Sequence, residues 1–262
     1  MGTLRTESIT DTQQLAQLMH SPTRERARAI LAAAQTGLPY AQTLLGQILL
    51  NGEGIEQDRD LVLTWFNIAA HAQEPMAFNM LGRCHEHGWG VEKNECAAVA
   101  YYQKAADLGL DWGQYNLANL LATGRGIERD ATRAVALYQQ AAEQGHAKSM
   151  NLLGRCYEEA VGVEQDTQAA LLWYQRSAQG GDFRGQYSLA TVLLNQGQID
   201  AALPWLQAAL AGGNLNFLRA TRAALRSVQH PSVQAIAQAF YEKAAQLGDH
   251  TDRDALADIN PR

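Results

Sequence analysis

The chain has 262 residues, a hydrophobic content of 47% and a formal net charge of −6 at pH 7. That hydrophobic content is ample for a folded core, whereas the negative charge argues against nucleic-acid binding, which calls for a basic stripe facing the phosphates. No stretch of the sequence approaches the roughly 18 apolar residues of a membrane-spanning helix, so we expect no membrane insertion.

The N-terminal region carries no recognisable targeting signal and begins the fold with an incomplete unit. The opening residues, MGTLRTESITDTQQ, lack the apolar segment of a secretory signal. Further on, Ala33 and Ala34 lie 36 residues before a similar pair, Ala69 and Ala70. We therefore predict a degenerate N-terminal helix pair over residues 11–37.

A block of about 36 residues then recurs, with four full copies over residues 41–184. Each copy has a Leu-Gly or Leu-Ala pair, a Gly-Ile or Gly-Val pair nine residues later, and an Asp or Asn four residues beyond that glycine. The leucine of the first pair recurs every 36 residues, at Leu45, Leu81, Leu117, Leu153 and Leu189. Such a period is typical of a solenoid of stacked helical units.

Each block is predicted to form two antiparallel helices. Glycine-rich loops such as NGEG and TGRG end the first helix, because glycine adopts positive φ without steric cost. The Asp or Asn that follows is predicted to cap the second helix by accepting from a free backbone amide. The small residue after each leucine lets the two helices approach closely, and bulky aromatic residues fill space between units. We interpret these landmarks as core and turn residues without ligand chemistry.

The pattern weakens toward the C-terminus. The fifth unit has a loop shorter by four residues, and the sixth keeps only its aromatic pair and the small residues that follow. We predict two degenerate repeats over residues 185–248 and a C-terminal cap or tail over residues 249–262, within a single solenoid domain that spans residues 1–262. Degenerate ends are expected because terminal units present one polar face to water.

These landmarks resemble the Sel-like repeat family, a relative of the tetratricopeptide repeats. Residues 77–112 satisfy nearly every landmark of the family pattern, A-x-x-x-L-G-x-x-Y-x-x-G-x-G-V-x-x-D-x-x-x-A-x-x-W-Y-x-x-A-A-x-x-G. The resemblance implies an all-α fold, a right-handed superhelical α-solenoid of helix-turn-helix repeats, that binds other proteins, usually without enzymatic activity. It also favours a bacterial source, because the family is abundant in bacteria.

The cysteines favour a reducing compartment. Cys84 and Cys156 occupy equivalent places 72 residues apart, too far along a solenoid for a disulfide. Some secreted members of the family carry paired cysteines within each unit, and this sequence does not show that regular pairing. We therefore expect a cytoplasmic protein.

One segment contains the residue types of a metal site. Cys84, His85, Glu86 and His87 are consecutive, but adjacent residues on a helix point about 100° apart and cannot converge on one ion. The sequence has no nucleophile–base motif, phosphate loop or metalloprotease signature. We predict no enzymatic activity, no catalytic residue, no metal and no cofactor, and keep a metal-dependent enzyme around this segment as the least favoured alternative.

The predicted binding surface is the concave face, which proteins of this architecture line with their first helices. Positions two before and two after each repeat leucine are four residues apart and share one helical stripe, which is polar and aromatic. Glutamates one turn further extend that stripe. The predicted partner-binding residues of this groove are Asn79, Arg83, Glu86, Trp112, Tyr115, Asn119, Asn151, Arg155, Glu158 and Tyr187, with Trp89 as an edge contact.

The stripe repeats with a period of 72 residues, because FNMLGRCHE matches MNLLGRCYE and GQYNLANLL matches GQYSLATVL. An extended peptide could use asparagine amides, tyrosine contacts and arginine forks on carboxylates along it. We predict an adaptor or scaffold for a protein or peptide with acidic side chains or a free C-terminal carboxylate.

Explanations that involve no binding partner remain open for the same residues. Recent duplication would preserve them without a ligand, Arg83 and Arg155 could pair with the glutamates three residues on, and Trp89 and Trp112 could fold back onto their neighbours. A different function is also open, that of a regulatory or accessory subunit capping a folded partner enzyme through its convex face or ends.

Overall fold

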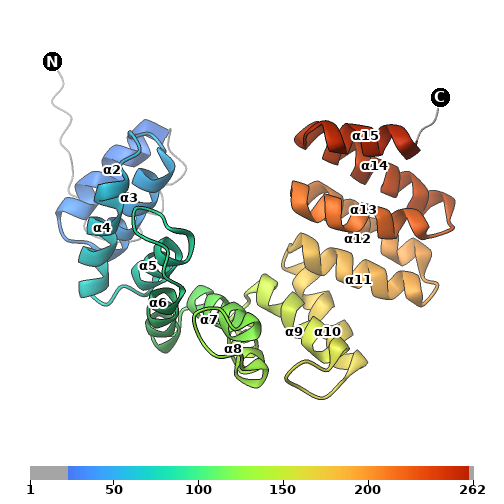
Figure 1. Ribbon diagram of the computed structural model, residues 1–262, viewed down its shortest axis with the longest axis horizontal. Helices are drawn as coiled ribbons and strands as arrows, with labels where there is room; N and C mark the ends of the chain where they lie inside the picture. Colours follow the sequence, from blue (N-terminus) through green and yellow to red (C-terminus); the bar gives the residue numbers. More distant parts are fainter. Residues whose placement is uncertain (1–22, 260–262) are drawn as a thin grey trace. The chain divides into compact units, whose positions relative to one another are not determined.

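The computed structural model describes residues 23–259, and all regular secondary structure in that range is α-helical (Figure 1). The all-α solenoid class predicted from the sequence is therefore confirmed. The first helix predicted for the opening pair, and residues 260–262 of the predicted tail, lie outside the described residues. The helices are α2 (Thr23–Gln35), α3 (Pro39–Asn51), α4 (Arg59–His71), α5 (Pro75–His87), α6 (Glu95–Asp107), α7 (Asp111–Thr123), α8 (Ala131–Glu143), α9 (Ala147–Glu159), α10 (Thr167–Gln179), α11 (Phe183–Asn195), α12 (Ile199–Gly212), α13 (Leu215–Ser227), α14 (Pro231–Leu247) and α15 (His250–Ile259).

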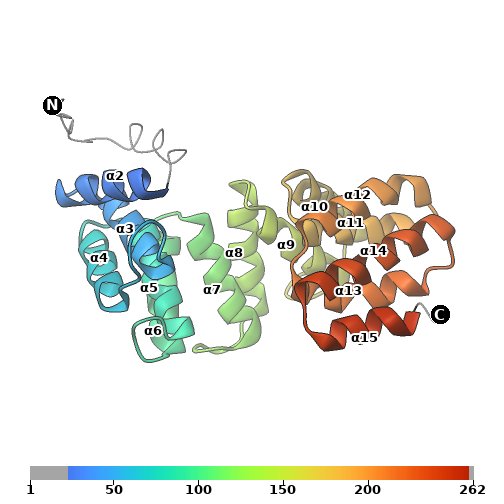
Figure 2. The same cartoon turned by 90° about the horizontal axis from the view of Figure 1, so that it is seen from above.

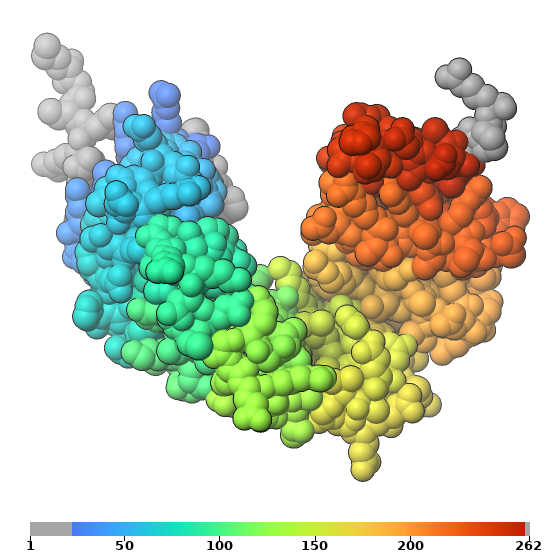
Figure 3. Space-filling model, viewed as in Figure 1, coloured from blue at the N-terminus to red at the C-terminus, as the bar shows by residue number. Residues whose placement is uncertain are grey.

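The chain divides between Leu137 and Tyr138, inside α8, into two compact units. In the N-terminal unit, α3 packs on α4 and α5 on α6, and the first helices α3, α5 and α7 contact one another in sequence (Figure 2). In the C-terminal unit, α9 packs on α10, α11 on α12 and α13 on α14, with α15 against α14. Within each unit, successive repeats lie directly against one another (Figure 3). The extent of a single domain and its internal boundaries remain predictions.

The second helices begin where the sequence predicts. Four polar side chains accept from backbone amides in the first turn of the helix that follows, as Asn94 Oδ1 does from Ala97 N at 2.9 Å. These N-caps occupy the same place in successive repeats because each follows the glycine-rich loop. The four confirmed caps are Asp58, Asn94, Asp130 and Asp166.

The first helices end in a left-handed residue, which is glycine in three of the four repeats. Gly52, Gly88 and Gly124 have φ of 71°, 73° and 73°. In the fourth repeat the same position holds Ala160, with φ of 56°. That alanine is strained, because a Cβ disfavours the left-handed region.

Small residues after the repeat leucines allow the close approach that the sequence predicts. An added Cβ would lie 2.6 Å from a ring carbon of Tyr102 at Gly82, and 2.7 Å from one of Tyr174 at Gly154. The rings belong to the second helix of the same repeat. These aromatic residues therefore fill space inside their own repeat, and not only between repeats as the sequence predicts. The contacts are Gly46 with Phe66, Gly82 with Tyr102 and Gly154 with Tyr174.

A buried carboxylate fixes the last helix. Asp252 on α15 is 0% exposed and accepts from Arg219 Nε at 3.0 Å and Arg222 at 2.9 Å, both on α13. The hydrogen bonds from Arg219 hold the pKa of Asp252 at about 2, below its ordinary value of 3.8.

Among residues 23–259, no helix has both the length and the apolar character needed to cross a membrane.

Candidate protein-binding surface

The predicted asparagines lie between first helices. Asn79 and Asn151 are only 3% and 4% exposed. The Oδ1 atom of Asn79 accepts from Asn116 Nδ2 at 2.8 Å, and that of Asn151 accepts from Ser188 Oγ at 3.0 Å. Both therefore join the first helices of consecutive repeats, which differs from the exposed amide ladder that the sequence predicts. The sequence did hold a signal for these bonds, a polar residue 37 positions after each asparagine.

The two glutamates of the stripe also have partners inside the stack. Glu86 accepts from the hydroxyl of Tyr102 at 2.7 Å, and Glu158 from that of Tyr174 at 2.6 Å. Burial and then these hydrogen bonds raise the pKa of both tyrosines. Glu86 is bound further by Arg125 of the next repeat, at 2.9 Å. Both glutamates thus stabilise their repeats, and Glu86, whose side chain is 12% exposed, is less accessible to a partner than the exposed Glu158.

The two arginines of the stripe differ in their surroundings. Arg155 pairs with Glu159 at 3.1 Å, one residue beyond the predicted Glu158. Arg83 forms no ion pair with any described residue, and its guanidinium lies 4.9 Å from the ring centroid of Trp89 and 3.8 Å from the sulfur of Met80. The second repeat thus holds a cation that has no carboxylate partner among the described residues.

The consecutive residues 84–87 point in different directions, as helical geometry requires. Cys84 is buried, and burial raises the pKa of its thiol to about 11. His85 stacks on Tyr101 at 5.3 Å, and the ring of His87 lies 4.8 Å from that of Trp89. In the part of the chain that the structure describes, no group of three or more His, Cys, Asp and Glu side chains could hold a metal ion.

The remaining stripe residues are aromatic or half-buried. Trp112 is 37% exposed and meets Tyr115 edge to face, with ring centroids 6.0 Å apart. Asn119 is half-buried on α7. In the C-terminal unit, Tyr187 packs edge to face on Phe217 at 5.6 Å, so it contributes to the core of that unit. One groove running through all the predicted residues remains a prediction, because those residues belong to two separate units.

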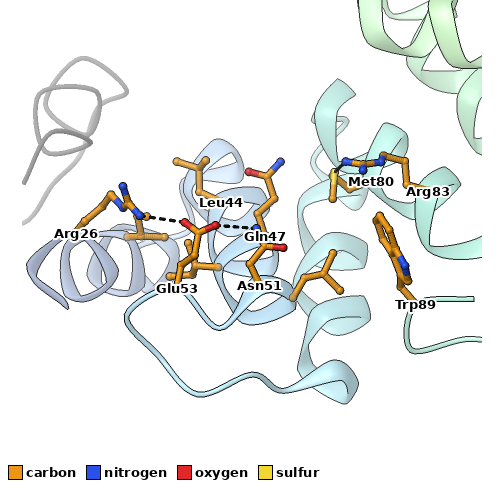
Figure 4. A pocket seen from close by; sticks show the side chains of 11 residues that line it. Arg26, Leu44, Gln47, Asn51, Glu53, Met80, Arg83 and Trp89 are labelled. Atoms are coloured by element: carbon orange, nitrogen blue, oxygen red, sulfur yellow. Dashed lines mark hydrogen bonds and ion pairs between the residues drawn. The ribbon is translucent and has the colours of Figure 1, made fainter. Parts of the chain in front are cut away.

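A pocket of about 360 Å³ opens between α2, α3, α5 and the loops after the two first helices. The apolar residues Ile30, Leu44, Ile48 and Met80 border it but are at most 8% exposed, so more of its open surface is polar than apolar. Figure 4 shows Arg26, Glu53 and Asn51 on one side of the pocket, and Arg83 with Trp89 on the other. The pocket therefore brings together two of the residues predicted from the sequence, Arg83 and Trp89.

The two polar sides of this pocket differ in charge. Glu53 is neutralised, since one carboxylate oxygen accepts from Arg26 at 3.0 Å and the other from Asn51 at 2.8 Å. Arg83 has no such partner among the described residues, and across from it the half-buried side chain of Gln47 makes no hydrogen bond. The pocket thus has a mainly polar lining, with one positive charge that no carboxylate among the described residues compensates. Sequence reasoning missed Arg26 and Glu53, which lie outside the stripe.

The comparisons with known proteins identify the repeat. A model of the Sel1 repeat matches residues 39–73, 75–110, 113–146, 147–182 and 229–249, more than half of the chain. The chain belongs to the Sel1 repeat family. Sel1 repeat proteins are mainly non-enzymatic, and the fold is generally a scaffold for protein–protein interaction. The stretch between the fourth and fifth matches is where the sequence predicts a degenerate repeat.

Solved structures of Sel1 proteins are similar to this chain. A Sel1 repeat protein from Oxalobacter formigenes is 25% identical, over 90% of this chain and 99% of that protein, with a TM-score of 0.76. The protective antigen c5321 of uropathogenic Escherichia coli, with an SLR fold, is 26% identical, with a TM-score of 0.64. The match covers 90% of this chain and 52% of the antigen, so this Sel1 chain spans about half the length of the antigen. The immunity protein Pa5087 of Pseudomonas aeruginosa is 18% identical over 86% of this chain and 88% of its own, with a TM-score of 0.55, and shares the fold. A search of curated proteins found no match.

Proposed function

We propose that this Sel1 protein is a non-enzymatic adaptor or scaffold that binds an extended segment of a partner protein on the first helices of its N-terminal unit. The observation that carries the proposal is Arg83, which forms no ion pair with any described residue and is held against Trp89 at the edge of a pocket. Arginine and tryptophan are the residue types most enriched among those that dominate protein interfaces.

The chemistry of this pocket favours an anionic group on the partner. A guanidinium binds a carboxylate through two parallel hydrogen bonds, and a fixed guanidinium loses less conformational entropy on binding. Contact with Trp89 and Met80 restricts Arg83 before any partner arrives. The partner segment therefore presents a carboxylate, from an acidic side chain or a chain end.

Arg155 offers a matched control for this proposal. It occupies the equivalent position of the fourth repeat, but it is paired with Glu159 and its side chain is 52% exposed. No tryptophan stands at the place equivalent to Trp89, where the fourth repeat has Val161. Charge reversal of Arg155 thus removes a similar surface charge without touching the pocket.

The test is an affinity purification from a lysate of the source organism, using the wild-type protein, Arg83→Glu and Arg155→Glu at matched thermal stability. We expect mass spectrometry to find a partner that wild type and Arg155→Glu recover and Arg83→Glu does not. Titration calorimetry with the purified partner then gives the loss of affinity. A partner that binds all three proteins equally would move the interface away from the pocket.

A second candidate is the accessory subunit that docks on a folded enzyme through its second helices. Leu61 and Ile68 on α4 are 44% and 41% exposed and lie seven residues apart, on one helical face. Exposed aliphatic side chains on one face suit a folded partner better than an extended peptide. Leu61→Asp with Ile68→Asp would abolish binding under this candidate and leave it unchanged under the first.

We also infer a bacterial, cytoplasmic protein. Its free thiols at Cys84, Cys96 and Cys156 suit a reducing compartment, and similar Sel1 structures come from bacteria. Fractionation of the source cells followed by immunoblotting tests the location. Recovery of the full chain in the periplasm or medium would contradict it.

A further inference from the structure

We infer that a pocket in the C-terminal unit, at the N-terminal end of α10, binds an arginine side chain of a partner protein, with the guanidinium on the Glu158 carboxylate. The Arg83 pocket belongs to the N-terminal unit, so this inference does not depend on the proposed function. Two observations lead to it. An arginine of this chain fills the equivalent place in the second repeat, and the loop that could supply one to the fourth repeat is too short.

The second repeat shows what such a place holds. Glu86 accepts from Tyr102 at 2.7 Å through Oε2, and from Arg125 Nη2 at 2.9 Å through Oε1. Arg125 belongs to the glycine-rich loop between α7 and α8. The next residue, Gly126, packs so closely on the start of α6 that an added Cβ would clash with the backbone of Glu95. The loop of the third repeat thus covers this helix end and gives a guanidinium to the glutamate of the second repeat.

The fourth repeat keeps the acceptor but has no such cover. Glu158 Oε2 accepts from Tyr174 at 2.6 Å, whereas its Oε1 atom has no hydrogen-bond or ion-pair partner among the described residues. The connection between α11 and α12 is residues 196–198, whereas that between α7 and α8 is residues 124–130. The shorter connection reads Gln-Gly-Gln and contains no cation. One carboxylate oxygen of Glu158 is therefore available to a partner.

A pocket of about 260 Å³ lies at this uncovered place. Its lining includes Glu158, Thr167 and Gln168, all exposed, which are the counterparts, 72 residues on, of the residues that the third-repeat loop packs against. The half-buried Leu171 and Val192 also line it, and more of its open surface is apolar than polar. An arginine suits such a lining, because its aliphatic stem covers apolar surface while its guanidinium reaches a carboxylate.

The charge and shape of the site define its ligand further. Because Glu158 has no cation beside it in the described part of the chain, the pocket attracts a positive group. A guanidinium can bond to Glu158 and also donate to the hydroxyl of Thr167, which stands where the second repeat has Glu95, 3.8 Å from Arg125. The close packing of Gly126 leaves no room for a side chain after the arginine. We therefore expect an Arg-Gly pair in an exposed loop of the partner.

The chain supplies its own probe for this site. A head-to-tail cyclic peptide of residues 122–130, ATGRGIERD, reproduces the third-repeat loop, whose ends are joined in the protein by a hydrogen bond from Asp130 N to Leu121 O at 3.0 Å. NMR chemical-shift titration of the full chain with this peptide measures the affinity. We expect Glu158→Gln to weaken binding about fivefold or more. Glu164→Gln, which removes the same charge from the loop before α10, should leave the affinity nearly unchanged.

Two variant peptides identify the group that binds. Arg125→Gln in the peptide should cost wild type the same factor as Glu158→Gln does, and should cost the Glu158→Gln protein little more, because the two changes remove one contact. Arg129→Gln in the peptide lowers its charge equally and should keep the affinity. Equal losses for the two peptides, or for the two protein variants, would mean long-range attraction only and would overturn the inference.

A loop graft tests the place of binding independently. Replacement of residues 196–198 by the sequence of residues 124–130 restores the long loop and should abolish binding of the cyclic peptide, because the graft occupies the pocket. A grafted protein that still binds the peptide would move the site elsewhere, and a wild-type protein that does not bind it at millimolar concentration would refute the inference. Melting temperatures of all variants matched to wild type show that a loss does not come from unfolding.

Discussion

The second and fourth repeats, residues 75–110 and 147–182, share the Leu-Gly-Arg-Cys segment but have different links to the repeat that follows. In both, a glutamate accepts from a tyrosine of the same repeat. In the second, Arg125 from the next glycine-rich loop also binds that glutamate, Glu86. The loop of the fifth repeat is shorter by four residues, and Glu158 has no arginine partner among the described residues. Duplication thus preserved contacts inside a repeat, while contacts between repeats depend on the next loop.

The same pair of repeats shows how two nearby residues change the role of an arginine. Arg83 and Arg155 lie at equivalent positions, but the residue four further on is His87 in one repeat and Glu159 in the other. The glutamate neutralises its arginine, whereas the histidine and Trp89 leave the first arginine unpaired. The pairing of the arginine therefore differs between repeats that share the same Leu-Gly-Arg-Cys segment.

The largest effect on stability should be common to both repeats. Gly82→Ala and Gly154→Ala each push a Cβ into a buried tyrosine ring, at 2.6 and 2.7 Å. We expect each to lower the free energy of unfolding by about 1–3 kcal/mol, the usual result of overpacking. Urea denaturation measures this loss. If only one variant were destabilised, the packing inside the two repeats would not be equivalent.

Protonation of Asp252 in acid should cause a smaller loss of stability, confined to the C-terminal unit. Because its pKa of about 2 in the folded state lies below the ordinary 3.8, the carboxylate stabilises the fold above pH 4 and loses this effect as pH falls toward 2. Hydrogen exchange between pH 4 and pH 2.5 should show α15 losing protection. Asp252→Asn should lower stability at pH 7 and flatten this pH dependence. An unchanged pH profile in the variant would exclude Asp252 as the titrating group.

Removal of the tyrosine hydroxyls should reduce stability by different amounts in the two repeats. Tyr102→Phe leaves Glu86, whose side chain is only 12% exposed, with one bonding partner fewer, at a cost of about 1–2 kcal/mol. Tyr174→Phe should cost about 0.5–1 kcal/mol, because water can reach the exposed Glu158. Thermal unfolding of the two variants gives the comparison. Equal losses would show that Arg125 and burial do not strengthen the bond in the second repeat.

The difference between the arginines can be removed by one substitution. His87→Glu gives Arg83 the partner that Arg155 already has, four residues further along the helix. We expect the affinity for an acidic partner to fall about three- to tenfold, because the added carboxylate competes for the guanidinium. Calorimetric titration against the partner found by affinity purification measures it, with His71→Glu on α4 as the control for added negative charge. Equal losses in both variants would indicate long-range repulsion.

The repeat landmarks predicted the helices and their caps because each has a local cause. A glycine-rich loop ends one helix, and an Asp or Asn such as Asn94 begins the next regardless of the rest of the fold. Arg83 and Trp89 were also predicted, as separate residues. Their contact was not, because it depends on how the loop after α5 folds back over that helix.

The other half of the pocket could not be predicted from the repeat alignment. Arg26 lies on α2, in the degenerate unit where equivalent positions are lost, and its pairing with Glu53 depends on the distance between α2 and the first loop. The hydrogen bond that Asn116 donates to Asn79 was missed for a related reason, since a spacing of 37 residues has meaning only when the stacking offset of the first helices is known. Contacts between repeats therefore could not be predicted from the sequence alone.

The smallest predicted effect concerns the loop position where the two repeats differ most simply. Gly88 and Ala160 both end a first helix in the left-handed region, with φ of 73° and 56°. Ala160→Gly should raise the free energy of unfolding by up to about 1 kcal/mol, because relief of left-handed strain exceeds the added entropy of the unfolded chain. Gly88→Ala should lower it by a similar amount, and urea denaturation of both variants measures the pair. If Ala160→Gly were destabilising, the methyl group would be contributing packing that outweighs its backbone strain, and the fourth repeat would have adapted its loop to alanine.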